Sequence, residues 1–297
     1  MLIVSPNVAL RCALLLAAAA WVATSGPPAL AQLDESLATG TTSKVQRTAA
    51  AGLIPYNRLE PGMARQVSEV VQNASIYRQL PVTTVKCDPD MYLTLLRYPE
   101  IIIGTWQLMG VTQMDARRTG PFQLHATDGA GTTTRSELIY GDPHLNIYYA
   151  EGEYEGPMVF RKITGKCLIV VESRYTAGAN GQPMVTSRMN VFLQFDNLAA
   201  GFIARTIHPL VGSTADHNFV ETMRFAEKLS QTTLRNGPGV QRMAARLSGL
   251  SPEVRQRFVD VAGVVWQRSQ PVQVQASPSP GMMQTGYTRQ VSGYRGN

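Results

Sequence analysis

Long hydrophobic runs are scarce in this sequence of 297 residues. The one uninterrupted apolar run near the N-terminus, Cys12 to Ala23, is well short of the roughly 20 residues that a membrane-spanning helix needs. No later run is long enough either. The scarcity argues against a transmembrane anchor, and we expect a soluble mature protein.

Clusters of basic residues are also missing, although the formal net charge is +6. The only adjacent basic pairs are Arg117-Arg118 and Arg161-Lys162. A nucleic-acid-binding protein gathers its basic residues on one element and interleaves them with aromatic residues. We therefore predict a mildly basic, solvated surface and no nucleic-acid partner.

Recognisable catalytic motifs are absent as well. The four histidines include no pair at the helical spacing of a zinc protease. Residues 129–134 lack the lysine of a phosphate-binding loop and are better explained as a hairpin turn, and residues 212–215 lack the flanking glycines of a nucleophile elbow. We predict no catalytic residue, no metal ligand and no cofactor.

An enzyme is the weakest of three functional hypotheses. His208 and His217 flank Asp216 near the entry to an expected long helix, an arrangement that can support acid–base or metal chemistry. The same segment also suits helix capping, because Asp216 and Thr214 can accept free N–H groups at a helix N-terminus. We favour capping, and the sequence leans away from an enzyme.

Three carboxylates alternate along the chain at Glu151, Glu153 and Glu155. An extended chain would place all three on one face, where they could bind Ca²⁺, which takes six to eight oxygen ligands. A solvated strand edge explains the same pattern, because charges on edge strands oppose aggregation. We favour the edge.

The N-terminal residues have the order of a cleavable secretory signal. Arg11 precedes the apolar run, and the small-residue triplet Ala29-Leu30-Ala31 comes before Gln32. This order of charged, apolar and cleavage regions predicts a signal peptide over 1–31, cut after Ala31. We expect an exported protein, either periplasmic or extracellular.

Export would remove Cys12 and leave Cys87 and Cys167. An even count in an oxidising compartment is consistent with a disulfide between them. Two buried free thiols are the alternative, since cysteine is among the most buried residue types. Both alternatives stay open on the sequence alone.

The rest of the chain divides by composition. We expect a flexible leader over 32–60 and a short helix over 61–81. A single α+β domain follows over 82–268, and a tail over 269–297, which has no acidic residue, is expected to be disordered.

Alternating and apolar segments separated by turn residues predict a long antiparallel region, because the connections are too short for parallel crossovers. A short strand precedes it at 82–87. The expected strands that follow are 112–118, 121–127, 133–140, 145–151, 158–163, 167–175, 184–196 and 201–207.

Helix starts are marked by capping residues followed by proline. Two short helices are expected between Asp88 and Gly110. After the strands, a long amphipathic helix is expected from Ser213 to about residue 234. Gly237-Pro238 and Ser251-Pro252 each begin a further helix.

This order of elements resembles the START-like, helix-grip superfamily. The segments that carry the likeness are 82–87, 88–110, the strands from 112 to 207 and the helix from 213 to 234. The resemblance implies an antiparallel sheet curved around the long helix, with an apolar ligand cavity between them. The segments 105–110, 118–121 and 128–131 also resemble an uncharacterised family of exported bacterial proteins, which implies no activity.

Aromatic residues concentrate in the expected sheet, where inward-facing rings can line an apolar pocket. The leading hypothesis is a non-enzymatic protein that binds an apolar small molecule or lipid in a sheet–helix cavity. The alternative is a structural or interaction protein of the cell envelope whose core is simply filled. The candidate ligand-binding residues are Trp106, Tyr140, Tyr148, Tyr175 and Phe192.

Overall fold

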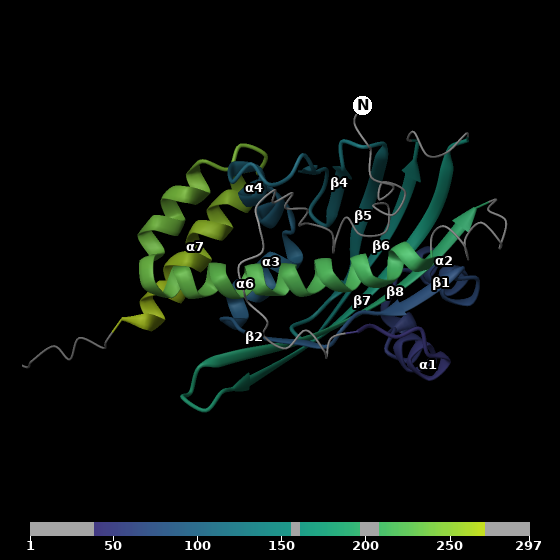
Figure 1. Ribbon diagram of the computed structural model, residues 1–297, viewed down its shortest axis with the longest axis horizontal. Helices are drawn as coiled ribbons and strands as arrows, with labels where there is room; N and C mark the ends of the chain where they lie inside the picture. Colours follow the sequence, from purple (N-terminus) through teal and green to yellow (C-terminus); the bar gives the residue numbers. More distant parts are fainter. Residues whose placement is uncertain (1–38, 156–160, 197–207, 271–297) are drawn as a thin grey trace, which may run out of the picture.

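The computed structural model describes residues 39–155, 161–196 and 208–270, apart from the side chains of 208–211 and 213. It shows an α+β fold in which one antiparallel sheet has a long helix across one face (Figure 1). The predicted fold class is confirmed. The signal peptide, the strand at 201–207 and nearly all of the tail lie outside the described residues.

The described strands are β1 (Ile76–Gln79), β2 (Thr83–Lys86), β3 (Asp115–Arg118), β4 (Gln123–Thr127), β5 (Thr132–Gly141), β6 (Leu145–Tyr154), β7 (Ile163–Ala177) and β8 (Pro183–Asp196). The helices are α1 (Lys44–Gly52), the short 3-10 helix η2 (Tyr56–Arg58), α2 (Pro61–Gln72), α3 (Pro89–Arg97), α4 (Glu100–Leu108), α6 (His208–Ala245) and α7 (Pro252–Ser269). None of these helices is both long and apolar enough to cross a membrane, within the described ranges.

The strands from β3 to β8 form a meander, because each pairs antiparallel with the next. Beyond β8, the strands β1 and β2 pair one after the other with the same edge: Ile76 lies opposite Leu193, and Thr83 lies opposite Ser187. The sheet order is therefore β1-β8-β7-β6-β5-β4-β3, with β2 also on β8.

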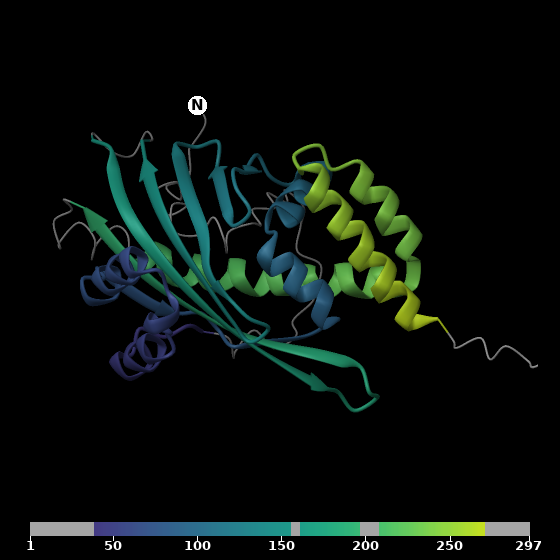
Figure 2. The same ribbon diagram turned by 180° about the vertical axis from the view of Figure 1, so that it is seen from behind.

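The sheet separates two layers of helices and two hydrophobic cores. Figures 1 and 2 show α6 on one face and α1 and α2 on the other, with α3, α4 and α7 gathered at one end. Adjacent residues of β8 point to opposite faces, so Val191 joins the core beneath α6 and Phe192 joins the core beneath α1 and α2. The second face of β8 is therefore covered by α1 and α2.

The N-terminal part differs from the prediction. Part of the expected flexible leader forms α1, where Ala50 is buried, and η2. The helix expected over 61–81 ends at Gln72, and Ile76–Gln79 form β1 instead. Tertiary pairing overrides local propensity here, because β8 offers this segment a ladder of backbone hydrogen bonds.

The expected strands at 158–163 and 167–175 imply a connection at 164–166, and this prediction is wrong. Gly165 lies within β7 and pairs with Gly152 of β6. A Cβ at position 165 would lie 2.7 Å from the backbone oxygen of Gln194. The glycine therefore permits a close approach of β7 to β8 rather than a change of direction.

The helices after the sheet follow the predicted starts in part. The helix α6 begins at His208, earlier than expected, so Thr214 and Asp216 lie inside it and do not cap it. Asn236 has non-helical backbone angles, which confirms the break predicted before Gly237-Pro238. Ser251 caps α7 by accepting a hydrogen bond from the Val254 N–H.

Cys87 and Cys167 are buried free thiols. Cys87 directly follows Lys86, which pairs with Met184 of β8, whereas Cys167 pairs with Leu193 of the same strand. At about 3.3 Å per residue, the stretch of β8 between these partners is roughly 30 Å long. Since a disulfide needs Cα atoms within about 7 Å, the disulfide alternative is not formed in this fold.

We expect a protein that begins at Gln32 to show two free thiols when it is denatured without reductant. The folded protein should react slowly with iodoacetamide at pH 8, because burial raises the pKa of both thiols to about 12 and the thiolate is the reactive form. The measurement is mass spectrometry after alkylation in the presence and absence of denaturant. A mass two hydrogens lower and no alkylation in denaturant would show a disulfide instead.

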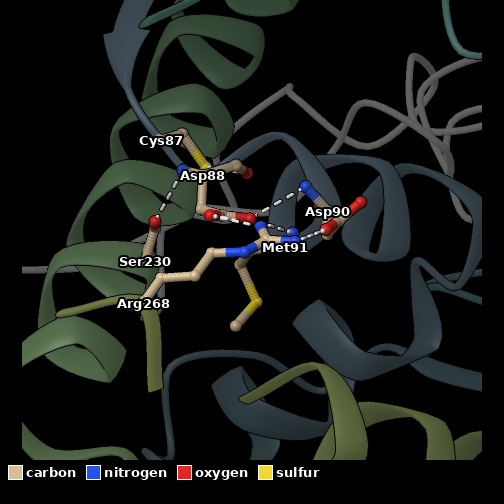
Figure 3. Close-up of polar contacts among 6 residues, drawn as sticks. All are labelled: Cys87, Asp88, Asp90, Met91, Ser230 and Arg268. Carbon is tan, nitrogen blue, oxygen red and sulfur yellow. Dashed lines mark hydrogen bonds and ion pairs between the residues drawn. The ribbon is translucent and has the colours of Figure 1, made fainter. Parts of the chain in front are cut away.

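The end of α7 is attached to the start of α3 by a fork of ion pairs (Figure 3). Arg268 donates to Asp88 at 2.9 Å and to Asp90 at 2.6 Å. Asp88 also caps α3, as predicted, by accepting the N–H groups of Asp90 and Met91. Ser230 of α6 accepts the Asp88 N–H at 2.9 Å. Three helices thus meet at the buried Asp88.

Replacing Arg268 by glutamine is expected to lower the free energy of unfolding by about 1–2 kcal/mol, because a buried carboxylate oxygen loses its charged partner. Denaturant unfolding monitored by circular dichroism measures the change. Arg224→Gln is the matched control, because Arg224 pairs with Glu221 at an exposed position. Equal stabilities of the two variants would contradict a role for the fork.

Candidate binding groove

A groove of about 540 Å³ lies where β4 is shorter than β5. Gln123, the first residue of β4, pairs with Glu137, whereas β5 continues to Gly141. A bulge at Ile139 further displaces this end of β5 from regular pairing with β6. The volume is within the range of about 300–1,000 Å³ that is typical of small-molecule sites.

The groove extends around the free edge of β5 and so has two sides. Its α3–α4 side contains residues of the α3–α4 connection, of β3 and β4, and the β5 residues Ser136 and Leu138. Its α2 side contains Glu60, Met63 and Glu137, because alternate residues of β5 point to opposite faces of the sheet.

A buried ion pair forms the polar base of the α3–α4 side. Arg118 binds both carboxylate oxygens of Glu100, at 2.6 and 3.0 Å, and Glu100 is only 2% exposed. The same guanidinium donates to the backbone oxygens of Pro121 and Arg97. Arg118 is therefore held in one orientation by the groups around it.

The ring of Tyr98 is close to two cations. The guanidinium of Arg118 is 4.7 Å from the centre of its ring, and that of Arg257, from α7, is 5.6 Å from it. These distances are within the range of cation–π attraction. The ring of Tyr98 is thereby fixed as part of the groove wall.

Apolar side chains supply the remaining surface of the α3–α4 side. Leu124 is buried and Leu138 is half-buried, while Phe122 is 61% exposed at the mouth. Apolar and aromatic side chains are the usual lining of small-molecule sites. This side can bury apolar parts of a small molecule.

The α2 side is more polar. Tyr140 donates a hydrogen bond to Asp142 and accepts one from Arg58, both at 2.8 Å. Although burial raises the pKa of Asp142, hydrogen bonds from the Leu145 N–H, the Tyr140 hydroxyl and the His144 N–H together lower it below its usual value. Asp142 is therefore ionised at neutral pH and holds Tyr140 in place.

Two of the five candidate ligand-binding residues line the groove. Tyr140 and Tyr148 both do so, from β5 and β6. The hydroxyl of Tyr148 donates to the Leu96 backbone oxygen at 2.7 Å. Both tyrosines have their hydroxyl protons engaged within the protein, so they present mainly their rings to the groove.

The other three candidates lie elsewhere, so the five do not form one pocket. Trp106 is buried against Phe225 of α6, with ring centres 5.2 Å apart. Tyr175 is on β7 and donates to the Pro143 backbone oxygen. Phe192 is in the core beneath α1 and α2. The concentration of aromatic residues suggested a pocket, but it did not show which face of the sheet each ring is on.

Beneath the described part of α6, the side chains form a filled core. Ala215, Phe219, Met223 and Ala226 all face the sheet and are at most 4% exposed. The groove lies instead beside β4 and β5, away from the expected sheet–helix cavity.

Asp216 is paired with a cation and lies within α6. Its carboxylate binds Arg78 of β1 at 2.5 and 2.8 Å and accepts the Gly40 N–H. His217 is exposed, and the side chain of His208 lies outside the described residues. The pairing leaves Asp216 unsuited to the acid–base role that the sequence allowed.

Glu151 and Glu153 are on β6, a central strand between β5 and β7, and Glu155 directly follows it, so the favoured interpretation as a strand edge is wrong. Glu153 pairs with Lys162 at 2.7 Å, and Glu151 accepts the hydroxyl of Tyr149. No group of three or more metal-ligating side chains occurs in the parts of the chain that the structure describes.

Sequence reasoning missed the residues that form most of the groove, among them Arg97, Tyr98 and Phe122. One signal was available. Arg118 and Pro121 are the first and last residues of one of the segments that carried the resemblance to exported bacterial proteins, and both line the groove. The motif could not show that Arg118 has a buried partner, Glu100, 18 positions earlier in the chain.

No protein-family model and no curated protein sequence matches this chain. Among solved structures, an uncharacterised protein from Rhizobium leguminosarum is similar, with 20% identity and a TM-score of 0.30 over 50% of this chain and 95% of its own. Protein XoxI from Bacillus cereus has 10% identity and a TM-score of 0.29, over 50% of this chain and 94% of its own.

The di-domain ARO/CYC protein BexL, from the BE-7585A biosynthetic pathway, has 15% identity and a TM-score of 0.25. The match covers 73% of this chain and 59% of BexL. At such low TM-scores these similarities assign no function to the chain. The fold class is assigned from the strands and helices of this chain itself.

Proposed function

We propose that this protein is exported and binds a small amphipathic molecule in the groove beside β4 and β5. The observation that carries the proposal is a 540 Å³ hollow with an apolar wall and a few fixed polar groups. Binding sites for small molecules commonly combine these two features. The residues that the ligand would contact first are Phe122, Leu124 and Leu138.

The rigidity of the wall supports binding. Arg118 and Tyr98 are each held by several contacts before any ligand arrives. A wall that is already ordered loses little conformational entropy when a ligand binds. Binding at this site therefore needs no rearrangement of Arg118 and Tyr98.

A fluorescence titration with N-phenyl-1-naphthylamine, a neutral apolar probe, tests the groove. We expect saturable binding to the purified protein and an affinity about 5-fold lower for Phe122→Ala, since an exposed ring that packs on the probe is lost. Val264→Ala is the control, because Val264 is 43% exposed on α7 outside the groove. Failure to bind, or equal effects of both substitutions, would overturn the proposal.

Export rests on the signal-like order of residues 1–31. We expect the mature protein from an expressing bacterium to begin at Gln32 and to occur outside the cytoplasm. N-terminal sequencing of material from cell fractions measures both. A mature chain that begins at Met1 in the cytoplasmic fraction would overturn this part of the proposal.

An envelope protein without a ligand is the second candidate, and the filled core beneath the described part of α6 favours it. It predicts no saturable probe binding. The probe titration therefore separates the two candidates.

A further inference from the structure

We propose that Arg97 is the anion-binding residue of the groove and that the ligand is a monocarboxylic acid with an apolar body. This inference rests on the proposed function and names the chemical class of its ligand. It follows from the distribution of charge on the α3–α4 side of the groove.

Arg97 is a half-buried cation that lines the groove at the end of α3. Its Nε donates to Asn146 Oδ1 at 3.1 Å, and no carboxylate among the described residues forms an ion pair with it. This side-chain hydrogen bond uses the Nε, so the two Nη nitrogens are left to face the groove that Arg97 lines. The outer end of the guanidinium is thus suited to a carboxylate, which it can bind through two parallel hydrogen bonds.

The other charges on this side are already neutralised. Arg118 and Glu100 form a bidentate pair, which leaves Arg97 as the excess charge among the lining residues of that side. The acidic lining residues Glu60 and Glu137 belong to the α2 side, across the sheet edge. Glu60 is engaged there as the cap of α2, since it accepts the N–H groups of Gly62 and Met63.

Because Arg97 is the single excess cation on this side, we expect a ligand whose head group carries one negative charge. A carboxylate carries a single charge, whereas a phosphate monoester carries close to two at neutral pH and would leave one without a partner. A carboxylate on Arg97 would place the rest of its molecule along Tyr98, Leu138 and Phe122, the apolar wall.

Calorimetric titrations with decanoate, decanol and decyl phosphate test the assignment, because the three share one alkyl chain and differ in head group. The wild-type protein should bind decanoate about 10-fold more tightly than decanol, as expected for a charge-assisted hydrogen bond. Decyl phosphate should bind no more tightly than decanoate. A clear preference for the phosphate would overturn the carboxylate class.

Arg97→Met keeps the apolar stem and removes the charge. It should lower the affinity for decanoate about 10-fold and leave that for decanol unchanged, while Arg97→Lys should restore part of the difference. The ratio of the two affinities is the readout, so partial unfolding of a variant does not alter it. Arg117→Met is the control, because Arg117 is a neighbouring exposed arginine outside the groove, paired with Asp115.

The outcomes separate the two proposals. If Arg97→Met binds decanoate as the wild type does, the anion-binding role of Arg97 is wrong and the groove remains a binding site. If the wild-type protein binds decanol but discriminates against decanoate, the carboxylate class is wrong. If neither decanol nor decanoate binds, the proposed function fails and the present inference fails with it.

Discussion

Replacing Arg118 by methionine is expected to lower the free energy of unfolding by about 3 kcal/mol or more. The substitution leaves the carboxylate of Glu100, which is 2% exposed, without its cation. Removing one partner of a buried ion pair typically costs about 3–5 kcal/mol, because the remaining charge is buried and uncompensated. The backbone oxygens of Arg97 and Pro121 lose a donor as well.

Chemical denaturation of three variants measures this effect and its cause. The double variant Glu100→Gln with Arg118→Met should be more stable than Arg118→Met alone, since a neutral amide replaces the unpaired charge. Arg117→Met, at an exposed position with a 75% exposed side chain, should unfold like the wild type. If the single and double variants unfold alike, the unpaired charge is not the source of the loss.

Replacing Phe192 by alanine is expected to cost about 3–5 kcal/mol of stability, the usual range for truncating a fully buried phenylalanine. The side chain is 0% exposed, and its ring centre is 5.0 Å from that of Tyr77. The space left beneath α1 and α2 could not close without moving the strands.

Phe122→Ala is the matched control for Phe192→Ala, because it removes the same atoms from a ring that is 61% exposed. It should barely change the midpoint of denaturation. For binding, Phe122→Ala should have the larger effect of the two variants. Three strand spacings, about 14 Å, separate β8 from β5. Folded Phe192→Ala should therefore bind N-phenyl-1-naphthylamine like the wild type. Weaker binding by Phe192→Ala than by Phe122→Ala would place the site elsewhere.

The groove lies beside β4 and β5 and not between the sheet and α6. The described side chains of α6 that face the sheet are buried in a hydrophobic core, and the polar base of the groove comes from Glu100 of α4 and Arg118 of β3. The hollow depends on a difference of strand length and on a bulge at Ile139. Changes in these short elements would alter the groove without altering the long strands that stabilise the sheet.

Local signals in the sequence were sufficient for most elements of the fold. Asp88-Pro89 and Ser251-Pro252 marked two helix starts, because a capping oxygen and a proline both act within one turn. The alternating residues of 184–196 predicted the strand β8. These signals need no knowledge of distant residues.

Only the tertiary structure decided how those elements combine. Phe192 is buried because α1 and α2 cover the second face of β8, and Ile76 is in a strand because β8 has a free edge there. Cys87 and Cys167 are kept apart by the register of β8. Arg97 has no carboxylate partner among the described residues, because Glu100 is taken by Arg118. Each of these facts depends on contacts between residues far apart in the chain, which short-range patterns do not encode.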